Sequence, residues 1–187
     1  MNLTELPVNL PTPIDDGAAD HLKDLMLPSI SLTSTNGNRV ELAKLTGRQV
    51  VFIYPMTGRP NVSLPDGWNE IPGARGCTPQ SCSFRDLYNE FKALNIEIFG
   101  LSTQSSEYQQ EVQVRLHLPF ELLSDAGLQL KNAIKLPTFK VVDMELYKRM
   151  TLIVDNGQIK KVFYPVFPAD RSADEVLNWL RNSKNNK

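Results

Sequence analysis

Two cysteines five residues apart are the residues of this sequence best suited to do chemistry. Cys77 and Cys82 are the only cysteines in the 187-residue chain. A close cysteine pair in a reducing compartment indicates redox or metal chemistry more often than a structural disulfide. Metal binding is the weaker interpretation, because a structural zinc takes four nitrogen or sulfur ligands and the two histidines, His21 and His117, lie far away in the sequence. We therefore expect redox chemistry and no bound metal.

A predicted helix contains the pair and places Cys77 at its beginning. Apolar residues recur at helical spacing after Ser83, namely Phe84, Leu87, Tyr88, Phe91 and Leu94. The unpaired N–H groups and the positive dipole end at a helix N-terminus favour the thiolate, which is the nucleophilic form of cysteine. Pro79 suits the first turn of such a helix, where a missing N–H costs nothing. The position predicts that Cys77 is a nucleophile.

The spacing between the two cysteines restricts how they can react with each other. Residues five apart on an intact helix have Cα atoms about 8–9 Å from one another, whereas a disulfide tolerates at most about 7 Å. A bond between Cys77 and Cys82 therefore requires the first helical turn to unwind. This behaviour suits oxidation of Cys77 to a sulfenic acid, which Cys82 then resolves to a disulfide.

Composition and charge exclude several other classes of function. The 20 basic and 21 acidic residues leave a net charge of −1, which gives no electrostatic basis for binding nucleic acid or an anionic membrane. The longest apolar run covers only residues 50–54, too short to span a bilayer. Residues 1–7 lack the basic and apolar segments of a secretory signal, so we expect a cytoplasmic location.

The remaining pattern predicts one α/β domain over residues 1–187. Its expected parts are an N-terminal arm (1–25), a hairpin around 36–38, a buried strand at 50–54, a long loop (56–76), the cysteine helix, a strand at 96–101, a helix over 108–116, a strand at 120–123, a helix capped by Asp125, a hairpin around 155–157 and a C-terminal helix (170–183). This order predicts a central mixed β-sheet flanked by helices, as in the thioredoxin-like fold.

The loop over residues 56–76 is unusual because it is rich in glycine and proline and poor in apolar residues. A structureless loop of this length inside a compact domain is usually functional or mobile. Trp68 is the residue best suited to dock back over the site, although it could equally anchor the loop and do nothing else.

Several segments resemble the peroxiredoxin Q (bacterioferritin comigratory protein) group of peroxiredoxins. They are residues 52–55, 76–86, 99–103, 122–125 and 148–155, and the resemblance extends from about residue 25 to residue 163. It implies a thioredoxin-like peroxiredoxin fold with an N-terminal hairpin and a long inserted loop before the active-site helix. By resemblance, Cys77 is the peroxidatic cysteine, Cys82 is the resolving cysteine, and Arg149 steadies the thiolate and polarises the peroxide.

The sequence departs from the family at one catalytic position. The family motif is Pro-x-x-x-Thr-x-x-Cys, and Ala74 stands where the threonine is expected. Pro55 matches the motif proline only if residues 56–72 contain a long insertion. Thr57 and Thr78 are the candidates for replacing the lost hydroxyl, so we expect Pro55, Thr57 and Thr78 to bind substrate.

The resemblance implies a thiol-dependent peroxidase of the atypical two-cysteine type. Such an enzyme reduces hydrogen peroxide and organic hydroperoxides, uses no cofactor, takes electrons from a thioredoxin- or glutaredoxin-like protein, and is a monomer or a small homodimer. Two alternatives remain open from the sequence. One is a thiol–disulfide oxidoreductase on the same fold, and the other is a redox sensor or holdase whose disulfide changes a binding surface.

Overall fold

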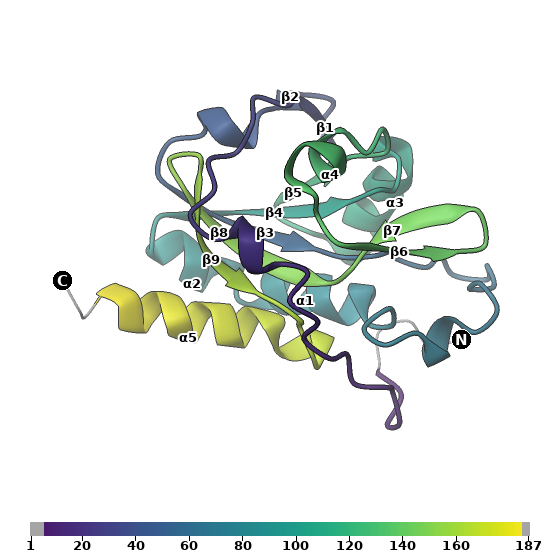
Figure 1. Ribbon diagram of the computed structural model, residues 1–187. Coiled ribbons are helices and arrows are strands. Elements are labelled where there is room, and N and C mark those ends of the chain that lie inside the picture. The colour runs from purple at the N-terminus through teal and green to yellow at the C-terminus, as the bar shows by residue number, and fades with distance from the viewer. Residues whose placement is uncertain (1–5, 185–187) are drawn as a thin grey trace.

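A seven-stranded mixed sheet forms the centre of the computed structural model, which describes residues 6–184 (Figure 1). Its strands are β1 (Leu32–Ser34), β2 (Arg39–Val40), β3 (Arg48–Ile53), β4 (Ile96–Ser102), β5 (Glu121–Ser124), β8 (Met150–Asp155) and β9 (Gln158–Phe163). They lie in the order β2-β1-β5-β4-β3-β8-β9, with β3, β4 and β5 parallel and the other pairs antiparallel. A separate antiparallel hairpin consists of β6 (Thr138–Val141) and β7 (Met144–Tyr147).

Five α-helices cover the two faces of this sheet. They are α1 (Cys77–Asp86), α2 (Tyr88–Ala93), α3 (Ser106–Leu116), α4 (Gln129–Ile134) and α5 (Ser172–Lys184). Side chains of α1, α2, α3 and α5 share one hydrophobic core, whereas α4 and the N-terminal arm contribute to a second core. In Figure 1, α5 and α1 lie below the sheet and α4 lies above it. The cysteine helix therefore packs beside α5 on the same face of the sheet.

Strand β3 lies in the interior of the sheet and leads toward the region of the cysteine helix. It pairs with β4 on one side and with β8 on the other, and every residue after Arg48 is buried. Val50 and Phe52 point into one core, while Val51 and Ile53 point into the other. A strand that is buried on both faces needs this continuous apolar run. Its carboxyl end delivers Tyr54 and the long loop toward the start of α1.

Most expected elements are confirmed, including both hairpins and the buried central strand. The apolar stripe after Ser83 predicted one continuous helix, but the structure divides it at Leu87 into α1 and α2. The backbone of Leu87 leaves the helical range there, with φ −99° and ψ 8°. The sequence analysis also missed the β6–β7 hairpin, which has charged residues in both strands.

The two ends of the chain follow the expected outline with small changes. The N-terminal arm contains a single 3-10 turn, Asp20–Leu22. The C-terminal helix begins at Ser172, after a 3-10 turn at Ala169–Arg171. Residues 1–5 of the expected arm lie outside the described residues.

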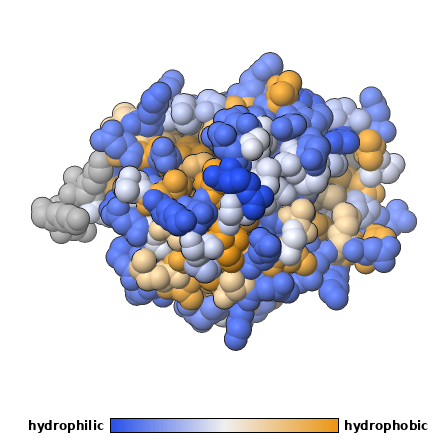
Figure 2. All heavy atoms as spheres, turned by 90° about the horizontal axis from the view of Figure 1, so that it is seen from above, coloured by the Kyte–Doolittle hydropathy of each residue, from blue (hydrophilic) through white to orange (hydrophobic). Residues whose placement is uncertain are grey.

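The surface carries hydrophilic side chains over most of the face seen from above, with hydrophobic residues in smaller groups between them (Figure 2). No helix within residues 6–184 is both long enough and apolar enough to cross a bilayer.

Candidate active site

Cys77 is the first residue of α1, and its side chain is 3% exposed. The helix is regular from its first turn, because the N–H of Gln80 donates to the carbonyl of Gly76 and the hydroxyl of Ser81 donates to the carbonyl of Cys77. The sulfur therefore lies where the helix N-terminus provides unpaired N–H groups and a positive dipole end. A helix N-terminus is a general position for reactive cysteines.

Arg149 joins the site from the connection between β7 and β8. Its Nη2 donates to the sulfur of Cys77 at 3.2 Å and to the carbonyls of Ala74 and Arg75 at 3.0 and 3.2 Å. Its Nε donates to the carbonyl of Gly73 at 3.2 Å. The guanidinium thus places a permanent positive charge next to the sulfur. Its hydrogen bonds to the carbonyls also fix the loop before the helix. The structure brings together Cys77 and Arg149, which the resemblance had paired.

Gln80 holds Arg149 in this position, and the sequence analysis did not identify it. Its side-chain oxygen accepts a hydrogen bond from Nη1 of Arg149, and its Nε2 donates to the hydroxyl of Ser172 at 3.2 Å. The Ser172 hydroxyl lies 3.3 Å from that of Thr151. All of these side chains are buried, so the network has no water to replace a lost partner. Gln80 could have been found from the sequence, because it follows Cys77 by three residues and therefore lies on the same face of the helix.

Cys82 lies one and a half turns further along the same helix, and its thiol is free like that of Cys77. It is half-buried against the hydrophobic core, and this burial raises its pKa, partly opposed by the charge of Arg85. An intact α1 keeps the two cysteines too far apart to bond. The structure is therefore a reduced, fully folded form of the pair.

Ala74 stands at the position of the family threonine and contributes through its backbone. Its side chain is buried in a small cluster with Trp68. Its carbonyl accepts from the Cys77 thiol at 3.6 Å and from Arg149 at 3.0 Å. The position therefore contacts both Cys77 and Arg149, but its side chain has no hydroxyl.

The three residues expected to bind substrate lie at different places. Thr78 is buried and lines the small cavity beside Cys77. The hydroxyl of Thr57 donates to the side-chain oxygen of Gln104 at 3.1 Å, and Thr57 does not line that cavity. Pro55 is buried after β3 and is also absent from the lining. Of the two threonines, Thr78 is the one that lines the cavity beside Cys77.

The cavity beside Cys77 is closed on one side by the long loop. Its lining consists of Met56, Gly58, Leu64, Trp68, Arg75, Gly76, Cys77 and Thr78. Its volume is about 10 Å³, which corresponds to about one water molecule. Trp68 lines this cavity and also packs against Phe139, so both expectations for it, docking at the site and anchoring the loop, fit its place. Arg75 is buried and lines the same cavity.

Gly76 fits the turn before α1 in a way that a larger residue cannot. Its φ is +110°, and a Cβ atom there would lie 2.7 Å from the Cβ of Ala169 and 2.8 Å from a methyl of Leu6. We expect Gly76→Ala to lower the free energy of unfolding by about 1–3 kcal/mol through backbone strain and this overlap. Chemical denaturation measures the change, and Gly37→Ala, which meets no atom within 4 Å, separates the overlap from backbone strain. Equal losses at the two glycines would contradict the expectation.

The sheet order and the arginine-bound thiol at the start of a helix together define a thiol-based redox protein of thioredoxin-like fold. The Redoxin family model matches residues 22–177. A curated relative, the chloroplastic peroxiredoxin Q of Sedum lineare, is 33% identical over 161 residues, covering 84% of this chain and 76% of the relative. The chain therefore belongs to the Redoxin family and, within it, to the peroxiredoxin Q group of thiol-dependent peroxidases.

Two solved structures share the fold. The peroxidoxin BcpB of Mycobacterium tuberculosis is 24% identical with a TM-score of 0.69, covering 86% of this chain and 96% of that chain. The bacterioferritin comigratory protein of Xanthomonas campestris, whose structure concerns alkyl peroxide reduction, is 19% identical with a TM-score of 0.66, covering 94% and 99%. These likenesses support the same arrangement of sheet and helices.

Proposed function

We propose that Cys77 is the peroxidatic cysteine and that Cys82 resolves it. The observation that carries this assignment is the 3.2 Å contact between Nη2 of Arg149 and the sulfur of Cys77 at the start of α1. In the first step the Cys77 thiolate attacks one oxygen of the peroxide and the O–O bond breaks. The products are a sulfenic acid on Cys77 and a hydroxide or alkoxide ion, which takes up a proton to become water or an alcohol.

The second step forms the disulfide, and it requires α1 to open. The first turn unwinds, which separates Cys77 and Gln80 from Arg149. The thiol of Cys82 then attacks the sulfenic sulfur, an S–S bond forms, and water leaves. Burial of Cys82 in the folded helix keeps it a neutral thiol until this movement brings it into solvent.

A dithiol protein completes the cycle. Its thiolate attacks the Cys77–Cys82 disulfide, a mixed disulfide forms, and a second thiol releases the reduced peroxidase while the partner is oxidised. A thioredoxin- or glutaredoxin-like protein has this chemistry. The substrates proposed are hydrogen peroxide and organic hydroperoxides, in line with the alkyl peroxide reduction studied for the Xanthomonas campestris protein. We further propose that the protein is a monomer or a small homodimer and that it is cytoplasmic. The Sedum lineare relative, by contrast, is chloroplastic.

The pairing of the two cysteines is tested by oxidation with one equivalent of hydrogen peroxide. We expect the intact mass of the reduced protein to fall by the mass of two hydrogens, with no covalent dimer. Digestion without reductant then yields one peptide pair joined through Cys77 and Cys82. A disulfide-linked dimer, or a gain of oxygen with no internal bond, would contradict the assignment of Cys82.

The half-buried thiol of Cys82 leads us to expect that the stability of the reduced protein depends on pH. Because burial raises the pKa of Cys82 in the folded protein, the unfolded chain loses this proton at a lower pH, near the ordinary value of about 8.5. The stabilisation by the neutral thiol is complete below the pKa of Cys82 in the unfolded chain. It is lost as the pH rises toward the pKa of Cys82 in the folded protein. We expect the difference in free energy of unfolding between reduced wild type and Cys82→Ser to shrink between pH 7 and about pH 9.5. Urea titrations at both pH values measure it, and a constant or growing difference would refute the dependence.

A further inference from the structure

We propose that the loop over residues 56–76 is a size filter that admits hydrogen peroxide to Cys77 and hinders hydroperoxides with bulky substituents. This inference rests on the proposed peroxidase function and concerns which substrates reach the same thiol. It is carried by the volume of the cavity at Cys77, by the origin of its walls, and by the contacts that hold those walls in place.

The cavity walls come from two segments of the chain. Met56, Gly58, Leu64 and Trp68 line the cavity from the first part of the loop, and residues 75–78 line it from the end of the loop and the start of α1. The volume of this partly open cavity, about 10 Å³, corresponds to about one water molecule. Hydrogen peroxide is little larger than water and requires only a small displacement of the walls. A cumyl or other bulky group would have to push the loop side outward.

The indole of Trp68 anchors the far part of the loop. Trp68 is buried, and its ring centre lies 6.2 Å from that of Phe139 in β6. It belongs to a cluster with Ala74, Val141 and Leu146, against which Leu64 and Met56 also pack. The β6–β7 hairpin therefore supports the wall from behind, so an outward displacement would break apolar contacts on both sides of the loop.

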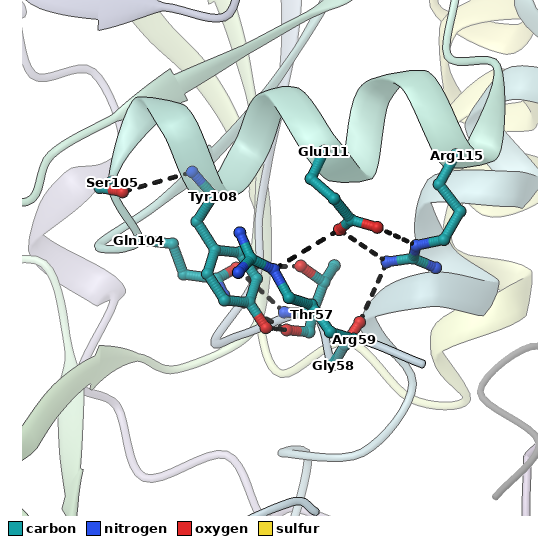
Figure 3. Close-up of polar contacts among 8 residues, drawn as sticks. All are labelled: Thr57, Gly58, Arg59, Gln104, Ser105, Tyr108, Glu111 and Arg115. Carbon is teal, nitrogen blue, oxygen red and sulfur yellow. Dashed lines mark hydrogen bonds and ion pairs between the residues drawn. The ribbon is translucent and has the colours of Figure 1, made fainter. Parts of the chain in front are cut away.

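A second set of contacts, which we call the α3 clamp, holds the beginning of the loop (Figure 3). It joins Thr57, Gly58 and Arg59 to Gln104, Tyr108, Glu111 and Arg115. Gln104 accepts from the N–H and the hydroxyl of Thr57 and donates to its carbonyl, so the pair is joined in both directions.

The clamp reaches the cavity wall itself. Arg115 donates to the carbonyl of Gly58 at 3.0 Å, and Gly58 is a lining residue. The guanidinium of Arg59 lies 3.9 Å from the ring centre of Tyr108, whose hydroxyl donates to the carbonyl of Thr57 at 3.0 Å. The loop is thus fixed on either side of Leu64, by the α3 clamp before it and by Trp68 after it.

The experiment compares kcat/KM for hydrogen peroxide with kcat/KM for cumene hydroperoxide. We expect wild type to favour hydrogen peroxide by at least about tenfold. Leu64→Ala shortens a wall side chain without removing the anchor or the clamp, and we expect it to reduce this preference by about tenfold, chiefly through a faster reaction with cumene hydroperoxide. Val62→Ala is the matched control, because Val62 belongs to the same loop, is exposed and does not line the cavity. Wild type that reduces both peroxides equally well, or equal changes in the two variants, would overturn the filter.

A second measurement tests access to Cys77 without peroxide chemistry. In the Cys82→Ser background, Cys77 is treated with methyl methanethiosulfonate and with the bulky reagent 5,5′-dithiobis(2-nitrobenzoic acid). We expect Leu64→Ala to accelerate the bulky reagent by about tenfold more than the small one, and Val62→Ala to change neither. A protein that shows this dependence but consumes no peroxide would refute the proposed function and support the filter. A peroxidase whose Cys77 reacts with both reagents in the same ratio in all variants would refute the filter alone.

Discussion

Replacement of Cys77 by serine is expected to abolish peroxide consumption, whereas Cys82→Ser is expected to preserve the first oxidation. A serine hydroxyl stays protonated and does not attack an O–O bond, so Cys77→Ser leaves only the slow reaction of an unactivated thiol. In Cys82→Ser the contacts of Cys77 with Arg149 and Ala74 are untouched, because position 82 does not take part in them.

The two variants therefore differ in a product that can be weighed. After one equivalent of hydrogen peroxide, Cys82→Ser should carry one sulfenic acid, which a dimedone adduct reports by mass, and excess peroxide should drive it to the sulfinic form. We expect its first-step rate constant to stay within about threefold of wild type, since the attacking thiolate is unchanged. An inert Cys82→Ser protein together with a reactive Cys77→Ser protein would reverse the roles of the two cysteines.

Replacement of Arg149 by methionine is expected to lower the rate constant for peroxide by about 10²–10³-fold. The guanidinium is buried and donates a hydrogen bond to the sulfur. Methionine has a similar length but no charge and no donors, so the thiolate loses its stabilisation and the carbonyls of Gly73, Ala74 and Arg75 lose their shared partner.

Two further variants separate charge from geometry at this position. Arg149→Lys keeps the charge but cannot bind the sulfur and the carbonyls at once, so its rate constant should fall between those of wild type and Arg149→Met. Arg181→Met is the matched control, since Arg181 is exposed and pairs with Glu90 on the surface. Stopped-flow measurement of thiol loss gives the rate constants, and circular dichroism checks folding. An Arg149→Met protein that is folded and fully reactive would contradict the role of the arginine.

Turnover distinguishes the peroxidase from the other two interpretations of the cysteine pair. A thiol–disulfide oxidoreductase would reduce protein disulfides and react with peroxide no faster than an ordinary thiol. A redox sensor would react with peroxide but fail to turn over with a reducing thioredoxin system. The peroxidase proposed here reacts quickly and is reduced again.

Much of the fold could be predicted from the sequence because its signals are local. The continuous apolar run around Phe52 predicted a central strand, and the turn at Asn156-Gly157 predicted the β8–β9 hairpin, since only a few residues decide each of these features. The start of α1 at Cys77 followed from the apolar stripe and from Pro79. The break at Leu87 has no comparable signal, because the apolar stripe continues across it.

The site was only partly predictable because its contacts are between distant residues. Arg149 lies 72 residues from the cysteine that it contacts, and only the family resemblance connected them. Gln80 is close to Cys77 in sequence, but its role depends on Arg149 and Ser172, which the fold brings to it. Thr57 belongs to the loop that leads to Cys77. Its hydroxyl, however, donates a hydrogen bond to Gln104, which lies in the connection between β4 and α3.

The most direct test of the central claim is the rate at which Cys77 reacts with hydrogen peroxide. Fully reduced Cys82→Ser protein is mixed with peroxide, and the loss of the Cys77 thiol is followed beside free cysteine at the same pH. The contact with Arg149 and the position at the helix N-terminus predict a rate constant at least about 10³-fold above that of free cysteine. A rate constant equal to that of free cysteine would show that the site does not activate its thiol for peroxide, and it would contradict the peroxidatic role of Cys77.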